Sequence, residues 1–147
     1  NKKISKYFIK KYYEPDLQLK FINNLLKLAN TSIDISDGLI DDLKKMINRQ
    51  SVSFHIFEKN IPISNTLSQL IEIKKLRKID ITSRGDDYQI LFTANSNKSR
   101  IIKRISNNTG IKITKIGKII SGRNKSKIIN IKNKQIEAKN KGYIHQF

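Results

Sequence analysis

Apolar residues recur along the chain at two spacings, and each spacing predicts a different kind of element. Apolar positions three or four residues apart, which is helical spacing, mark segments 1–13, 16–28, 38–49, 66–76 and 97–107. Short alternating or continuous apolar runs, which are typical of strands, mark segments 32–36, 52–57, 79–82, 88–93, 111–120 and 127–131. Because the two kinds of segment interleave, the sequence predicts an α/β (α+β layered) domain with a mixed β-sheet flanked by helices.

Three of these segments carry more detailed expectations. We expect Asp16 to cap the second helix, and we expect a buried stripe on it formed by Leu19, Ile22, Leu25 and Leu26. The segment 88–93 is apolar on both faces, which is typical of a central strand. The helix at 38–49 presents one apolar face, formed by Leu39, Ile40, Leu43, Met46 and Ile47.

The length and composition limit the class of protein. The chain has 147 residues, about the size of one domain, and 37% of them are hydrophobic, which is enough to build a core. It has no cysteine, which excludes disulfides and thiolate metal sites. No apolar run approaches the roughly 20 residues needed to span a bilayer. The chain opens with Asn1 and shows no signal peptide, so we expect a cytoplasmic piece of a longer polypeptide that does not associate with a membrane.

The net charge of +18 is the most conspicuous feature of the composition. Such an excess is typical of proteins that bind nucleic acid. Here, however, the basic residues are mostly lysines spread over the whole chain, and lysine, isoleucine and asparagine all have A/T-rich codons. We therefore interpret the charge as compositional and regard a nucleic-acid partner as unlikely. A basic nucleic-acid-binding module is the alternative; it predicts an affinity that falls steeply with salt.

The acidic residues are few and clustered. Of twelve Asp and Glu residues, six lie in two short segments: Asp34, Asp37, Asp41 and Asp42 in the first, and Asp86 and Asp87 in the second. Alternation along a strand places Asp34 and Ser36 on one face, and Gly38 lets a ligand or another backbone approach closely. Carboxylates suit Mg²⁺, and the N-terminus of the following helix suits phosphate. Together these features predict a site for a nucleotide with Mg²⁺.

A structural interpretation competes with the functional one at several of these positions. Asp37 could be a simple N-cap, and Asp41 and Asp42 could face solvent in the first helical turn. Residues 85–87 are also ordinary turn chemistry. Asp34 fits a structural role poorly, because aspartate is disfavoured in strands.

The two histidines give no sign of a metal site. His55 lies in an apolar strand segment and is interpreted as an ordinary sheet residue, and His145 stands near the end of the chain. They have no spacing typical of zinc ligands.

Four strings, taken together, resemble one enzyme family. D-I-S-D-G-L at 34–39 resembles the signature of the thiamine-monophosphate kinase family, and S-R-G-D-D-Y-Q-I-L-F-T at 83–93 resembles its S-G-G-E-D-Y-E-L-L-F-T segment. I-G-K-I at 116–119 and G-Y-I-H-Q-F at 142–147 are similar to its I-G-R-I and G-Y-D-H-F strings. The four occur in the family's order and span nearly the whole chain.

The resemblance implies the C-terminal domain of that kinase, within the aminoimidazole-ribonucleotide-synthetase-like superfamily. Residues 1–30 would be a helical lead-in from a missing N-terminal ATP-binding domain, and 31–147 would be the C-terminal kinase domain. The complete protein would be a homodimer. The isolated chain would be about half an enzyme and would show no turnover.

The family's pattern also implies roles for individual residues. Asp34 and Asp37 would bind Mg²⁺, Ser36 would contact ATP, and Asp86 and Tyr143 would contact the substrate, thiamine monophosphate. No catalytic side chain is implied. The reaction would be ATP- and Mg²⁺-dependent phosphorylation of thiamine monophosphate to thiamine diphosphate.

The chain also departs from the family's pattern at three positions. Arg84 replaces a glycine, Asp86 a glutamate and Ile144 an aspartate. These changes leave two further alternatives open: another member of the superfamily, and a non-catalytic remnant.

Overall fold

The computed structural model describes residues 2–85 and 88–139. The helices are α1 (Lys2–Tyr13), α2 (Ile22–Leu28), α3 (Leu39–Met46), α4 (Asn65–Lys74), α5 (Lys78–Thr82) and α6 (Ser99–Thr109). The strands are β1 (Thr31–Asp34), β2 (Val52–Phe57), β3 (Ile90–Thr93), β4 (Gly117–Ser121), β5 (Lys127–Ile129) and β6 (Gln135–Ile136). Short 3₁₀ turns occupy Leu19–Phe21, Glu58–Asn60 and Ser96–Lys98. Over the described residues, no helix has the length and apolar character required to cross a bilayer.

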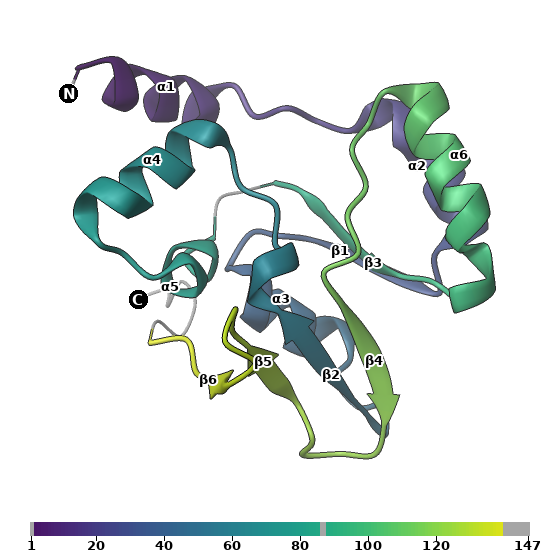
Figure 1. Ribbon diagram of the computed structural model, residues 1–147. Coiled ribbons are helices and arrows are strands. Elements are labelled where there is room, and N and C mark those ends of the chain that lie inside the picture. The colour runs from purple at the N-terminus through teal and green to yellow at the C-terminus, as the bar shows by residue number, and fades with distance from the viewer. Residues whose placement is uncertain (1, 86–87, 140–147) are drawn as a thin grey trace, which may run out of the picture.

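The strands form two sheets (Figure 1). The larger has the order β4-β2-β5-β6, and β2 pairs antiparallel with β4 but parallel with β5. The smaller consists of β1 and β3, paired antiparallel so that Asp34 lies opposite Ile90. The predicted α/β class with a mixed sheet is therefore confirmed.

Helix α3 supplies much of the core. Its buried residues pack with side chains from β2, β3, β5 and α5, and the apolar face predicted for the helix is confirmed. The core consists of Ile35, Leu39, Ile40, Leu43, Met46, Phe54, Ile56, Ile61, Ile79, Leu91 and Ile128, with Ile47 packed against it. Because α3 is fixed by this core, the loop that leads into it is held in a defined place.

The remaining helices lie around this centre. The end of α2 is tied to the start of α6, because the Lys98 ammonium before α6 donates to the Leu28 carbonyl at the end of α2; Figure 1 shows both helices on the same side of the molecule. Phe21 packs against Phe92 of β3 with ring centroids 5.6 Å apart. Helix α1 lies next to α4 in the same view.

The segment 79–82 forms helix α5, so the prediction of a strand there was wrong. A run of four residues is too short for its pattern to distinguish the two. Ile79 is fully buried, and the Ser83 hydroxyl donates to its carbonyl at 2.8 Å, which closes a helical turn.

The prediction that 88–93 is a central strand was also wrong for the described chain, because β3 pairs only with β1 among the described strands. Its two faces are apolar for another reason: Leu91 belongs to the core cluster, while Phe92 packs on Phe21. Both faces are covered by side chains from other elements. Tyr88 has a φ of +50°, which is not extended backbone, so the strand begins later than predicted.

The stripe predicted on the second helix is not buried. Leu19 and Leu26 are 67% and 80% exposed, whereas Phe21 and Leu28 are buried. The segment starts as a 3₁₀ turn. Phe21 and Leu28, seven residues apart, lie on one face, and this face is turned inward instead of the predicted one. Asp16 does not cap this helix; its carboxylate contacts the Lys11 ammonium.

Candidate functional site

The loop of residues 36–38, called here the Asp37 loop, connects β1 to α3. Asp34 ends β1 and is exposed, and burial alternates along the strand as the predicted period of two requires. Among the described residues, the Asp34 carboxylate and the Ser36 hydroxyl have no hydrogen-bond or ion-pair partner. Within the described part of the chain, both groups are therefore candidates for contact with a ligand.

Asp42, in the first turn of α3, holds this loop from inside. Its side chain is only 1% exposed, and its Oδ2 atom accepts three backbone N–H groups: those of Ser36 at 3.0 Å, Asp37 at 2.9 Å and Gly38 at 3.0 Å. The expectation that Asp42 faces solvent was wrong. The helical spacing already contained the signal, because Asp42 lies three residues after Leu39, on the apolar face of the helix.

Lys45 joins the two carboxylates of this region. Its ammonium donates to Oδ1 of Asp42 at 3.0 Å and contacts Oδ2 of Asp37. The hydrogen bonds to Asp37 and then Asp42 raise the pKa of Lys45. Burial alone would raise the pKa of Asp42, but the hydrogen bonds from Lys45 and from the loop N–H groups outweigh it and lower that pKa.

The structural alternative for Asp37, a simple N-cap, was wrong. The N-cap of α3 is Gly38, which has a φ of +126° and makes no side-chain cap hydrogen bond. The Asp37 carboxylate is half-buried and turned to Lys45 instead. Asp41 is paired with Lys44 at 2.9 Å, in line with the expected surface role.

Two glycines bring the two acidic segments of the sequence into backbone contact. A Cβ atom on Gly38 would lie 2.4 Å from the carbonyl oxygen of Ser83, and a Cβ atom on Gly85 would lie 2.2 Å from that of Ser36. Residues 83–85, called here the Gly85 loop, therefore pack directly on the Asp37 loop. Only glycine allows this approach at either position.

Asp86 and Tyr143, the predicted substrate contacts, lie outside the described residues. The described residues on either side of 86–87 are nevertheless anchored near Asp37: Gly85 packs on Ser36, and the Tyr88 N–H donates to the Ile35 carbonyl at 3.0 Å. Arg84 is exposed on the Gly85 loop.

Both carboxylates predicted to bind magnesium, those of Asp34 and Asp37, lie among the described residues. Asp34 and Asp37 offer carboxylate oxygens, which suit Mg²⁺, whereas both oxygens of Asp42 are engaged within the fold. No group of three or more His, Cys, Asp or Glu side chains that could hold a metal occurs in the described part of the chain. His55 lies in β2 opposite Lys118 and Lys127, as the interpretation of it as a sheet residue predicted.

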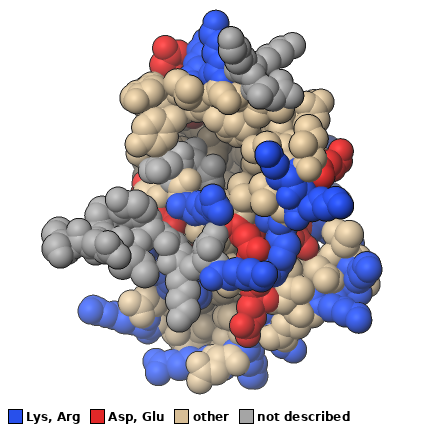
Figure 2. Space-filling model, turned by 90° about the vertical axis from the view of Figure 1, so that its left-hand side faces the viewer, with Lys and Arg blue, Asp and Glu red and all other residues tan. Residues whose placement is uncertain are grey.

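Charge is distributed rather than concentrated on the surface that Figure 2 shows. Lys and Arg side chains there are interspersed with Asp and Glu side chains, which gather near the middle of the view. On this face, the described residues form no continuous basic stripe of the kind that follows a nucleic-acid backbone.

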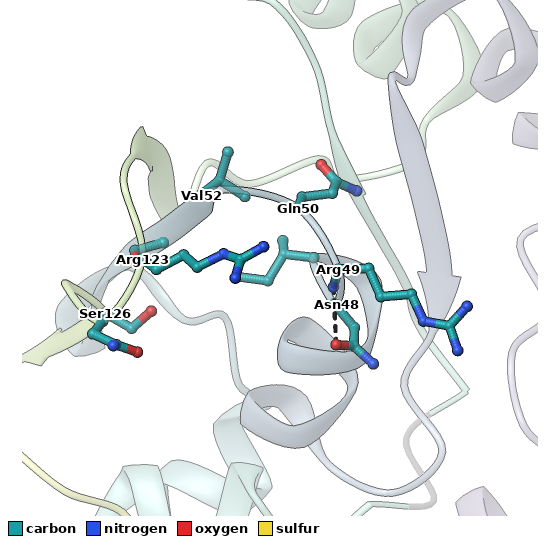
Figure 3. A pocket seen from close by; sticks show the side chains of 9 residues that line it. Asn48, Arg49, Gln50, Val52, Arg123 and Ser126 are labelled. Atoms are coloured by element: carbon teal, nitrogen blue, oxygen red, sulfur yellow. Dashed lines mark hydrogen bonds between the residues drawn. The ribbon is translucent and has the colours of Figure 1, made fainter.

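A cavity of about 680 Å³ lies apart from the predicted site, between the end of α3 and the turn that joins β4 to β5. Arg123 extends across it, whereas the Arg49 guanidinium points away (Figure 3). The cavity lining includes no Asp or Glu, and none of the predicted site residues contributes to it.

No family model matches the chain, but comparison with known proteins finds relatives that share one name. The chain is 32% identical over 145 residues to the thiamine-monophosphate kinase of Buchnera aphidicola subsp. Schizaphis graminum, which covers 99% of this chain and 44% of the relative. The crystal structure of the Aquifex aeolicus thiamine monophosphate kinase is 27% identical with a TM-score of 0.71, covering 91% of this chain and 42% of that one. A structure described as AaThiL complexed with AMPPCP and TMP is 26% identical with a TM-score of 0.71, covering 96% and 42%.

The fold and the paired loops define an α/β domain with an acidic loop at the start of a buried helix. The comparisons make the assignment specific: the chain is homologous to the C-terminal region of thiamine-monophosphate kinases. It spans less than half the length of each of these three relatives.

Proposed function

We propose that this chain is the C-terminal part of a thiamine-monophosphate kinase, which transfers a phosphoryl group from ATP to thiamine monophosphate and yields thiamine diphosphate. One observation carries the proposal most directly. The Asp37 loop and the Gly85 loop, which carry the two most specific family strings, pack backbone against backbone. A relative with the same fold has been crystallised with AMPPCP and TMP.

We assign Asp34 and Asp37 as the residues of this chain that hold Mg²⁺. Asp34 is exposed and has no partner among the described residues, and Asp37 presents one oxygen to Lys45. When bound, Mg²⁺ supplies positive charge between the phosphate groups of the two substrates. Two carboxylates are a sufficient protein contribution for an ion that retains several of its waters.

Ser36 is assigned to ATP through its side chain rather than its backbone. Its N–H is already donated to Asp42, so the hydroxyl is the group available to a phosphate oxygen. Asp86 and Tyr143 are assigned to thiamine monophosphate; an aromatic ring suits its cationic thiazolium.

The chemistry explains why carboxylates dominate the site and why no general base is assigned. The attacking group is a phosphate oxygen, and a phosphate monoester with its second pKa near 6 is largely ionised at neutral pH. The difficulty is repulsion: two unit charges 4 Å apart repel by about 4 kcal/mol at an effective dielectric near 20. The protein's task is to position the two substrates and balance their charge.

The proposal includes the rest of the enzyme. Residues 1–30 lead in from an N-terminal ATP-binding domain, residues 31–147 form the C-terminal kinase domain, and the complete protein is a cytoplasmic homodimer. Because most ligands of the nucleotide lie in the other domain under this proposal, we expect the 147-residue chain alone to show no turnover. ATP-dependent formation of thiamine diphosphate by this chain would contradict that expectation.

The decisive experiment is Asp34→Asn in the complete protein, including the sequence that precedes Asn1. The substitution removes a charge but keeps the size of an exposed side chain, so we expect loss of activity with an unchanged circular dichroism spectrum and melting temperature. Asp16→Asn is the matched control, because Asp16 is also exposed but pairs with Lys11 far along the chain from both loops. Near-normal turnover of the Asp34 variant would count against its metal role.

A further inference from the structure

The buried Asp42 carboxylate holds the backbone of the Asp37 loop. We propose that Asp42 is a positioning residue, which fixes the Asp37 loop and thereby sets the Asp37 carboxylate in place for the cation. This inference rests on the proposed function, in which Asp37 binds Mg²⁺.

The geometry differs from an ordinary helix cap. In a capping box, an acidic side chain in the third helical position reaches back to a single N–H group, that of the N-cap residue. Asp42 is the fourth residue of α3, and one of its oxygens accepts three consecutive N–H groups at 2.9–3.0 Å. Three convergent N–H groups form a concavity that binds anions. The fold fills that concavity with its own carboxylate.

This internal anion occupies the backbone donors of the loop. The N–H groups of residues 36–38, just before α3, all donate to Asp42, so the Ser36 hydroxyl is the group that the loop offers to a phosphate. The carboxylates of Asp34 and Asp37, beside it in sequence, suit a cation. Asp42 thus orders the backbone that carries Asp37.

Lys45 completes the arrangement from the other side. It binds the Asp42 oxygen that does not face the loop, at 3.0 Å, and it contacts Oδ2 of Asp37. Oδ1 of Asp37 has no partner among the described residues. The loop is therefore held by its backbone through Asp42 and by one side-chain oxygen through Lys45, and the second oxygen of Asp37 faces no competing group there.

The test compares Asp42→Asn with Asp41→Asn in the 147-residue chain. Both variants lose one negative charge on the same helical turn, but within the described residues Asp41 pairs only with Lys44. Amide hydrogen exchange measured by NMR reports directly on the three N–H groups. We expect exchange at residues 36–38 to be at least tenfold faster in Asp42→Asn and unchanged in Asp41→Asn. Exchange in β2 should stay within twofold of wild type in both, which separates loop release from global unfolding.

A Mn²⁺ titration of the same samples measures the cation affinity of the loop. If Asp42 had only a structural role, this affinity would be the same in wild type and in Asp42→Asn. We expect broadening at the Asp37 loop in wild type and at least fivefold weaker binding in Asp42→Asn. Unchanged exchange at 36–38, or unchanged Mn²⁺ affinity in Asp42→Asn, overturns the inference. If wild type shows no Mn²⁺ site at the loop, the proposed metal role fails, and the exchange result alone decides whether Asp42 holds the loop.

Lys45→Met keeps the test decisive if Asp42→Asn does not fold. It removes the ammonium but leaves all three contacts of Asp42 Oδ2, so protection at 36–38 should stay within threefold of wild type. Loss of protection in Lys45→Met would show that the lysine, rather than Asp42, holds the loop.

Discussion

Gly85 packs so closely on Ser36 that a single added carbon would lie 2.2 Å from the Ser36 carbonyl oxygen. The two residues are far apart in the sequence, and each belongs to one of the two acidic segments. Gly38 makes the reciprocal approach to Ser83. The contact is made by backbone atoms on both sides, so it depends on the absence of a side chain.

Alanine at Gly38 or Gly85 should therefore be strongly destabilising. Both residues have positive φ values, +126° and +90°, and a strained backbone of this kind costs about 1–3 kcal/mol for a residue with a side chain. The clash with backbone atoms adds to that, so we expect each variant to lose about 3 kcal/mol or more of its free energy of unfolding. Urea unfolding of the 147-residue chain measures it.

Gly110 is the matched control for these two glycines. It also has a positive φ, +70°, and ends α6, but a Cβ atom there would meet nothing within 4 Å. Gly110→Ala should cost only about 1 kcal/mol. Equal losses at all three positions would show that backbone conformation alone, rather than the contact between loops, requires these glycines.

The stabilisation that Asp42 provides should depend on pH. Burial opposes ionisation of Asp42, but its hydrogen bonds from Lys45 and the loop lower its pKa below the ordinary value of 3.8. A carboxyl whose pKa is lower in the folded than in the unfolded state stabilises the fold above its unfolded pKa, and the contribution disappears as pH falls through the folded pKa. Asp42→Asn should cost about 2 kcal/mol at pH 7.

Unfolding curves for wild type and Asp42→Asn at several pH values between 7 and 2 check this sign. The difference in the free energy of unfolding should be constant down to about pH 4 and shrink below it. All other acids are common to both proteins and cancel in the comparison. A difference that stays constant to pH 2, or grows, would contradict the assignment of a stabilising charge to Asp42.

Features that depend on periodicity within one helix or strand were predicted better from the sequence than contacts between elements. The apolar face of α3 and the alternation of faces along β1 follow from local periodicity and are found in the structure. The buried role of Asp42 could have been predicted too, because its spacing from Leu39 places it on the apolar face. A charged side chain favours exposure to solvent, but three hydrogen bonds from backbone N–H groups compensate for the burial of Asp42.

Other features had no local signal. The contact between the Gly85 and Asp37 loops joins segments nearly fifty positions apart. The presence of a glycine in the sequence does not indicate which segment packs against it. The stripe predicted on the second helix had the opposite problem: its helical spacing is present, but the segment turns the face of Phe21 and Leu28 inward instead. For Asp86 and Tyr143 the site assignment stays a prediction.

The correction at α2 makes a prediction about stability. Phe21 is 3% exposed and packs on Phe92, whereas Leu26 is 80% exposed. Truncating a buried phenylalanine to alanine costs about 3–5 kcal/mol, so Phe21→Ala should be severely destabilising. Leu26→Ala should change the free energy of unfolding by less than about 0.5 kcal/mol. A large loss in Leu26→Ala would show that this residue is buried in solution by a contact that the described chain does not make.

Arg84 stands where the resembling family has glycine, and the structure shows that the backbone does not require glycine there. Its φ is not positive, and its N–H donates to the Ile81 carbonyl at 3.1 Å. Arg84→Gln should therefore leave the stability of the chain within about 0.5 kcal/mol of wild type.

In the complete protein, under the proposed function, the guanidinium draws the phosphate of thiamine monophosphate to the Gly85 loop. We expect a severalfold higher KM in Arg84→Gln at low salt and a smaller difference at 0.5 M salt, where about 4 Å of screening length remains. Arg100→Gln removes the same charge from an exposed position on α6, and it should leave KM unchanged. Equal effects of the two variants on KM would assign the role of Arg84 to the overall charge of the chain rather than to its place beside the Asp37 loop.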